Sequence, residues 1–201
     1  IYTTAFSPSY TLRWVMRDRE EDLLQFIEED PESLVIALKS IAKSLIEFNR
    51  ILSEETGVEG FYYCVNNQNN FFEDSFFTTN VAPHEKQVLE KANELSDINI
   101  LHICGYDGLS NDLKLFKDFE AAAYNWDVGA EGVSLSEGKK LFGGKAVIGG
   151  FEQDQVIYTG TREEVENTTF DILAECSQIG TMIGAGCTLP TDIEEIRLEW
   201  V

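Results

Sequence analysis

The sequence predicts an α/β fold of the TIM (β/α)8-barrel type, in which the 201 residues form a single domain and supply the last six βα units. Three observations lead to this prediction. Six strand-like segments alternate with helix-like segments, several of these strands are continuous apolar runs, and polar or reactive residues follow the strand ends. Continuous apolar runs indicate strands buried on both faces of a parallel sheet. An open doubly wound sheet shares the alternation, but a barrel brings all the strand ends around one mouth.

The first half of the chain is predicted to hold two strands and four helices. One helix is especially clear, because Asp30 can cap it, Pro31 suits its first position and Gly57 can end it. Pro83 precedes the last of the four helices. The elements expected in this half are strands at 1–6 and 58–65 and helices at 9–18, 20–30, 30–57 and 84–96.

The second half continues the alternation with four strands and three helices. Thr161 and Glu164 form a capping-box pattern, which marks the start of the longest of these helices. The expected elements are strands at 98–104, 121–126, 145–151 and 181–187 and helices near 111–119, 135–142 and 161–178. Because a complete barrel takes about 250 residues, two βα units are expected to precede residue 1.

The chain is strongly acidic, with 36 acidic and 15 basic residues and a formal net charge of -21. Such a charge repels the phosphates of nucleic acids and of anionic membranes, so neither is expected as a partner. The apolar stretches are far shorter than the roughly 20 residues that span a bilayer, and no signal-peptide pattern opens the chain, so a cytoplasmic protein is expected. Four cysteines are too few for a disulfide framework, which favours thiols or metal ligands.

The stretch LHICG, residues 101–105, places a histidine and a cysteine on one face of a strand. Side chains at i and i+2 point to the same side, so His102 and Cys104 are expected together where the strand ends. A catalytic zinc site takes three protein ligands and leaves a fourth position open. Cys187, which ends another apolar strand among glycines, is the best third ligand, and Cys64 competes for that role. Buried side chains that bind no metal are the alternative.

Other residues at the strand ends are candidates for catalysis and substrate binding. Asp127, two residues after Asn125, is a candidate general acid/base or partner of the imidazole, and both are predicted catalytic residues; a loop-capping aspartate is the alternative. Gly149 and Gly150 are candidates for substrate binding, and the alternative is that they only allow the backbone to make a tight turn. Cys176 falls in a helix in apolar company, which predicts core packing. The predicted substrate-binding residues are Asn66, Asn67, Gly149 and Gly150.

Six segments carry a resemblance to a known family through the order in which they follow one another: TAFSPSYTLRWVM, the long helix after EDPES, LHICG, KAVIGGFE, GTREEV and IGAGCTLPTD. Together they resemble the uroporphyrinogen decarboxylase superfamily. This group of TIM barrels includes cobalamin-dependent methyltransferases that act on thiols, of the methylcobalamin:coenzyme M type. The resemblance covers essentially the whole chain, but only the carboxyl-terminal part of a family member.

The resemblance is nearest to the methyltransferase branch. In that branch the histidine and cysteine of an H-x-C segment, together with a cysteine in a late glycine-cysteine segment, bind zinc. His102, Cys104 and Cys187 match these ligands residue by residue. The resemblance therefore implies Zn2+ as a cofactor, a small thiol as methyl acceptor, and a corrinoid as methyl donor, either free methylcobalamin or a corrinoid protein.

Two other functions remain open. Uroporphyrinogen decarboxylases of porphyrin (heme) biosynthesis resemble the chain too, but they carry no zinc and have a histidine-bearing glycine segment where this chain has GAGCTLP. They also use an arginine-rich loop near the amino terminus, which these residues do not contain. The third possibility is a truncated, non-catalytic member of the superfamily, whose exposed sheet edges would pair with another chain, as in a homo-oligomer.

Overall fold

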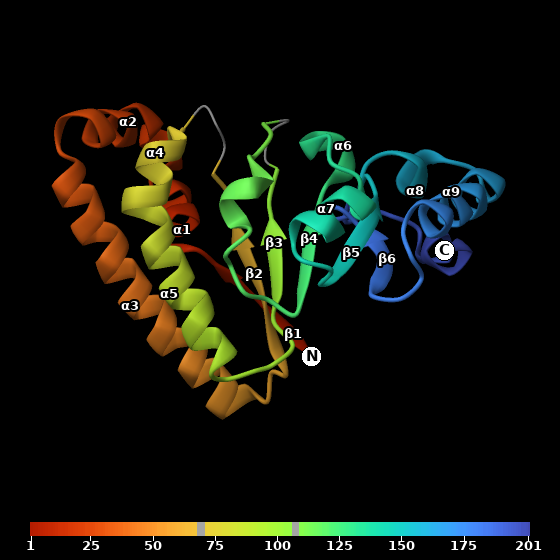
Figure 1. The fold of residues 1–201 in the computed structure, drawn as a ribbon, viewed down its shortest axis with the longest axis horizontal. Coiled ribbons are helices and arrows are strands. Elements are labelled where there is room, and N and C mark those ends of the chain that lie inside the picture. The colour runs from red at the N-terminus through yellow and green to blue at the C-terminus, as the bar shows by residue number, and fades with distance from the viewer. Residues whose placement is uncertain (68–70, 106–108) are drawn as a thin grey trace. The chain divides into compact units, whose positions relative to one another are not determined.

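Six strands form one sheet in the computed structural model, which describes residues 1–67, 71–105 and 109–201. The strands lie in the sheet in the order of the chain, and β1–β2, β4–β5 and β5–β6 pair in parallel (Figure 1). A doubly wound sheet reverses its strand order at a switch point, whereas successive βα units of a barrel do not. The α/β prediction is confirmed, and the strand order fits six consecutive units of a TIM-type barrel. The strands are β1 (Tyr2–Phe6), β2 (Gly60–Val65), β3 (Ile100–Ile103), β4 (Ala123–Trp126), β5 (Ala146–Phe151) and β6 (Thr181–Ala185).

The chain divides into two compact units, and the first comprises residues 1–102 and 118–122. It holds β1, β2 and most of β3. Its two longest helices, α3 and α5, pack side by side (Figure 1). The helical elements are α1 (Pro8–Val15), η1 (Arg17–Arg19), α2 (Glu20–Glu29), α3 (Pro31–Thr56), α4 (Asp74–Phe76), η2 (Phe77–Val81) and α5 (Ala82–Asn93).

Helix α3 begins and ends where the sequence predicts. The Asp30 side chain accepts a hydrogen bond from the Ser33 backbone N–H at 3.2 Å, which satisfies one of the unpaired donors of the first turn. Pro31 lies in that turn, where its missing N–H costs no helical hydrogen bond. Gly57 ends the helix with a left-handed φ of 71°, a conformation that glycine adopts without strain. The predicted helix caps are confirmed.

Two predicted helices differ from the observed ones. The helix expected after Pro83 starts earlier, because α4 and the π-helical turn η2 run directly into α5. Pro83 lies in the first turn of α5, a position that tolerates proline, so it does not mark the start of the helical segment. The helix expected near 111–119 is only a 3-10 turn, η3 (Leu113–Phe116), whose buried residues Leu113 and Phe116 are three apart and so lie on one side.

The second unit comprises residues 103–117 and 123–201 and contains β4, β5 and β6. One hydrophobic cluster of this unit consists of Phe151 of β5, Ile157 of α8 and Val165 of α9. The predicted capping box of α9 is confirmed, since Thr161 and Glu164 bind each other's backbone N–H groups. Besides η3, its helical elements are α6 (Val128–Glu131), α7 (Leu135–Leu141), α8 (Val156–Thr159), α9 (Arg162–Glu175) and the 3-10 segment η4 (Glu195–Trp200).

No helix among the described residues combines the length and the apolar character needed to cross a membrane. The single-domain assignment stays a prediction.

Candidate metal centre

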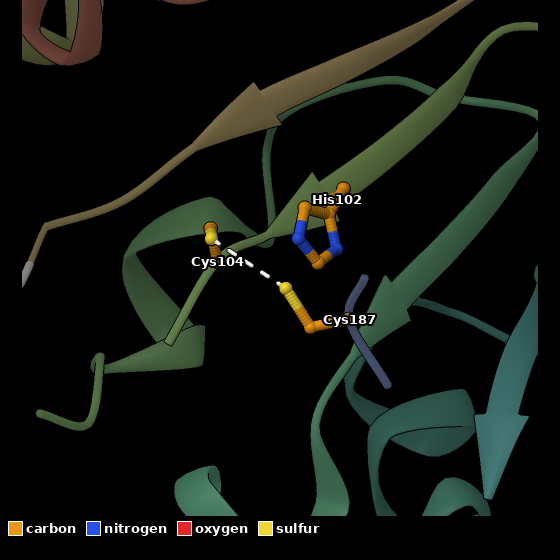
Figure 2. A group of neighbouring side chains, drawn as sticks. All are labelled: His102, Cys104 and Cys187. Carbon is orange, nitrogen blue, oxygen red and sulfur yellow. Dashed lines mark hydrogen bonds between the residues drawn. The ribbon is translucent and has the colours of Figure 1, made fainter. Parts of the chain in front are cut away.

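His102, Cys104 and Cys187 form a cluster of potential metal ligands. Their donor atoms, one from each side chain, all lie within 4.8 Å of one another. Figure 2 shows the three side chains lying next to one another. The Cys104 and Cys187 sulfur atoms are 4.0 Å apart. The structure thus brings together the three ligands that the sequence predicts.

Strand β3 presents the first two of these residues. Leu101 and Ile103 are fully buried on the opposite side of the strand, as the two-residue period requires. His102 lies within β3 and Cys104 directly follows it, and both side chains are buried. Cys187 follows β6 by two residues and is half-buried. All three candidate ligands therefore stand at the carboxyl ends of strands, where TIM barrels place their functional residues.

The donor set fits zinc. Tetrahedral coordination with Zn–S bonds near 2.3 Å separates two cysteine sulfurs by about 3.8 Å, close to the 4.0 Å between Cys104 Sγ and Cys187 Sγ. A disulfide would require a separation of about 2 Å, and all four cysteines are free. One imidazole and two thiolates are a known catalytic zinc set, which leaves a fourth position for water or substrate.

The His102 ring stacks on Tyr62 of β2. Their ring centroids lie 5.0 Å apart with an interplanar angle of 23°. Because offset stacking restricts rotation of the imidazole, Tyr62 limits the directions in which the two ring nitrogens can point. Tyr62 is not among the predicted site residues, although it occupies the same face of its strand as Cys64 and Asn66.

Gly186 allows the segment that carries Cys187 to approach β4. A Cβ atom at position 186 would lie 2.5 Å from the Cα atom of Asp127, so no larger residue fits without backbone movement. The Gly186 N–H also donates a hydrogen bond to the Phe151 carbonyl at 2.7 Å. Gly186 therefore permits the close approach of this segment to Asp127.

Gly186→Ala is expected to weaken zinc binding at least about tenfold, because the clash with Asp127 displaces Cys187 from the other two ligands. The measurement is competition for zinc with a chromophoric chelator. Gly184→Ala is the matched control, since a Cβ atom there would meet Ile148 at an ordinary contact distance of 3.5 Å. Equal zinc affinities for the two variants would contradict the role given to Gly186.

Asn125 and Asp127 make structural hydrogen bonds. The Asn125 amide donates to the Ile148 carbonyl at 2.9 Å and to the Ala185 carbonyl at 3.1 Å, and so ties β4 to β5 and β6. Asp127 Oδ1 accepts from the Gly129 and Ala130 N–H groups and caps α6, which confirms the capping alternative. Catalytic roles for the two residues stay predictions.

The predicted substrate-binding residues fall into two places. Asn66 and Asn67 directly follow β2 and are buried, and Asn66 Oδ1 accepts a hydrogen bond from Arg13 Nη1 at 2.9 Å. Gly149 and Gly150 lie within β5 rather than in a turn and have φ values of 144° and 109°. These φ values suit glycine alone. A substrate-binding role for the four residues stays a prediction.

The other two cysteines lie outside the three-residue cluster in the described part of the chain. Cys64 Sγ contacts the Tyr62 carbonyl oxygen at 3.8 Å. Cys176 directly follows α9, which ends at Glu175, so the prediction that it falls in a helix is wrong. The residue is buried, with its sulfur 3.1 Å from Thr181 Oγ1. The core-packing prediction for Cys176 is therefore confirmed.

Comparisons with known proteins support the fold. No protein-family model matches this chain, and no curated protein matches it in sequence. Among solved structures, the chain is similar to a methyltransferase from Methanosarcina mazei, with a TM-score of 0.74, 13% sequence identity and coverage of 100% of this chain. The chain spans 56% of the length of that protein. At this identity the likeness shows the fold, and membership of the uroporphyrinogen decarboxylase superfamily stays a prediction.

Proposed function

We propose that this chain is an enzyme, a zinc-dependent methyltransferase that moves a methyl group from a corrinoid to a small thiol. The observation that carries the proposal is the meeting of His102, Cys104 and Cys187 in one donor cluster. The likeness in fold to a methyltransferase from Methanosarcina mazei adds support. Zinc bound at these residues would hold a substrate thiol in its fourth position as a thiolate at neutral pH.

The protein's own residues prepare this site. Cys104 and Cys187 bring two ionisable sulfurs to within 4.0 Å of each other, and the first side chain is buried while the second is half-buried. Two thiolates so close repel each other, and a divalent cation between them relieves that repulsion. Tyr62 holds the imidazole plane of His102, so the third ligand is oriented before a metal binds.

The remaining assignments belong to the same proposal. Asn125 and Asp127 are the proposed catalytic residues beside the thiol site. A corrinoid protein that delivers the methyl group would need a positively charged surface, because this chain carries a net charge of -21. A cytoplasmic location suits free thiol ligands, since that compartment is reducing. The proposed substrate-binding residues are Asn66, Asn67, Gly149 and Gly150.

The purified protein is expected to contain one equivalent of zinc and to demethylate methylcobalamin only when a thiol acceptor is added. Metal analysis measures the first, and the visible spectrum of the corrinoid follows the second. The control is the same assay without thiol.

Zinc below one-half equivalent after reconstitution would contradict the proposal. Conversion of uroporphyrinogen to coproporphyrinogen without zinc would favour the decarboxylase alternative instead. Stoichiometric zinc without either activity would favour the non-catalytic alternative.

A further inference from the structure

We propose that Asn111 and Glu131 are positioning residues that fix the direction of Cys104 at the metal centre. This inference rests on the proposed function, since it gives Cys104 the role of zinc ligand. Neither residue stood out in the sequence, because the contact joins a loop to a short helix 20 residues further along the chain.

Asn111 joins Glu131 to the backbone of Cys104. The Asn111 backbone N–H donates to Glu131 Oε2 at 2.6 Å, and its side-chain amide donates to Glu131 Oε1 at 2.7 Å. The same amide nitrogen donates its second hydrogen to the Cys104 carbonyl oxygen at 3.2 Å. Both hydrogens of the Asn111 amide are therefore used, which leaves this side chain one orientation.

Burial makes this arrangement costly to disturb. Asn111 and Glu131 are 7% and 9% exposed, so a carboxylate is held where water hardly reaches it. A buried carboxylate needs hydrogen-bond donors, and Asn111 supplies one to each of its oxygens. Gly105 leaves room for this carboxylate, because a Cβ atom at position 105 would lie 3.0 Å from Glu131 Oε1.

The hydrogen bond to the Cys104 carbonyl restricts the backbone angle ψ of Cys104. Cys104 is the first residue after β3, where the regular strand conformation no longer fixes the chain. Its Sγ must nevertheless lie 4.0 Å from Cys187 Sγ to complete the cluster. Partners that orient a metal ligand are typically worth about 10- to 100-fold in metal affinity. Glu131 acts on Cys104 through Asn111 and contributes no ligand to the three-residue cluster.

Glu131→Gln is expected to weaken zinc binding about 10- to 100-fold. The glutamine NH2 group would face the Asn111 side-chain NH2 group, and both are donors. The Asn111 side-chain amide must therefore turn, and it loses its hydrogen bond to the Cys104 carbonyl. Zinc affinity is measured by chelator competition, and the visible spectrum of the Co2+-loaded protein reports the thiolate ligands. Glu85→Gln is the matched control, because Glu85 is also a buried carboxylate but bonds to Ser7 and Ser9. Its zinc affinity is expected to equal that of the wild type.

A double variant separates positioning from simple stability. In Asn111→Asp with Glu131→Gln, the glutamine can donate to the aspartate, so the bond between the two side chains is restored and part of the lost melting temperature should return. Aspartate at position 111 cannot donate to the Cys104 carbonyl, so zinc affinity should stay low. Recovery of zinc affinity together with stability would overturn the proposal.

The metal-free protein provides a test that does not depend on zinc. Alkylation of Cys104 and Cys187 is followed separately by peptide mass spectrometry. Glu131→Gln is expected to change the alkylation rate of Cys104 by severalfold and to leave that of Cys187 unchanged. Unchanged rates for both would overturn the positioning role. If the wild type binds no zinc while the Cys104 rate shifts, the proposed function fails and the positioning role stands.

Discussion

Replacement of Cys187 by serine is expected to abolish stoichiometric zinc binding and, with it, thiol-dependent demethylation of methylcobalamin. The hydroxyl of serine is not deprotonated at neutral pH and is a poor zinc ligand, so only His102 and Cys104 remain. Two ligands cannot hold zinc against a competing chelator. Zinc content after gel filtration and the rate of demethylation measure the two effects.

Cys176→Ser is the matched control for this substitution. Cys176 is buried, but its sulfur lies beside Thr181 Oγ1 and outside the cluster of His102, Cys104 and Cys187. The control is expected to keep its zinc and activity while losing some stability. If Cys187→Ser retains one equivalent of zinc, or if Cys176→Ser loses zinc to the same extent, the assignment of Cys187 as a ligand is wrong.

Glu85→Gln is expected to stabilise the protein by about 3 kcal/mol at pH 8 and to change stability little at pH 4. Glu85 is fully buried in α5, and burial raises the pKa of its carboxyl group from 4.5 to about 7 despite hydrogen bonds from Ser9 and Ser7. The Ser7 hydroxyl donates to Glu85 Oε1 at 2.8 Å. Within the described residues, Oε2 has no hydrogen-bond partner.

The sign of this pH dependence follows from the raised pKa. Below pH 4.5 the Glu85 carboxyl is protonated in both the folded and the unfolded chain, so its ionisation does not lower the free energy of unfolding. Between pH 4.5 and about 7 the unfolded chain ionises first, and the folded state loses stability as the pH rises. Glutamine resembles the protonated acid and does not ionise, so the variant lacks this loss.

Urea denaturation of wild type and variant across pH 4 to 8 measures the difference in the free energy of unfolding. Other titrating groups act on both proteins alike, so only the difference reports Glu85. A difference that is constant with pH would contradict the raised pKa.

The predicted strands agree with the structure because each depends on local signals. An apolar run followed by glycine or a polar turn identifies a buried strand without knowledge of its neighbours, as at residues 146–151. The caps at Asp30 and Thr161 are likewise local, since each involves residues three positions apart. The start of α5 was misplaced because a proline in the first turn of a helix resembles a helix boundary in sequence.

The cluster of His102, Cys104 and Cys187 is partly predictable for the same reason. His102 and Cys104 share a strand, so the two-residue period alone places them together. The prediction that Cys187 lies beside them depends on a further assumption, that the carboxyl ends of the strands converge as they do in a barrel. The contact of Glu131 with Asn111, and of Asn111 with the Cys104 carbonyl, depends on how a loop folds back, and no periodic pattern encodes that.

Zinc K-edge X-ray absorption of the zinc-loaded protein identifies the atoms bound to the metal. Two sulfur neighbours near 2.3 Å and one imidazole nitrogen near 2.0 Å are expected, with a light atom or a third sulfur from an added thiol in the fourth position. Loss of one sulfur neighbour in Cys104→Ser would assign the signal to the cluster of His102, Cys104 and Cys187. A spectrum with only nitrogen and oxygen neighbours would contradict the metal centre, and with it the proposed thiol chemistry.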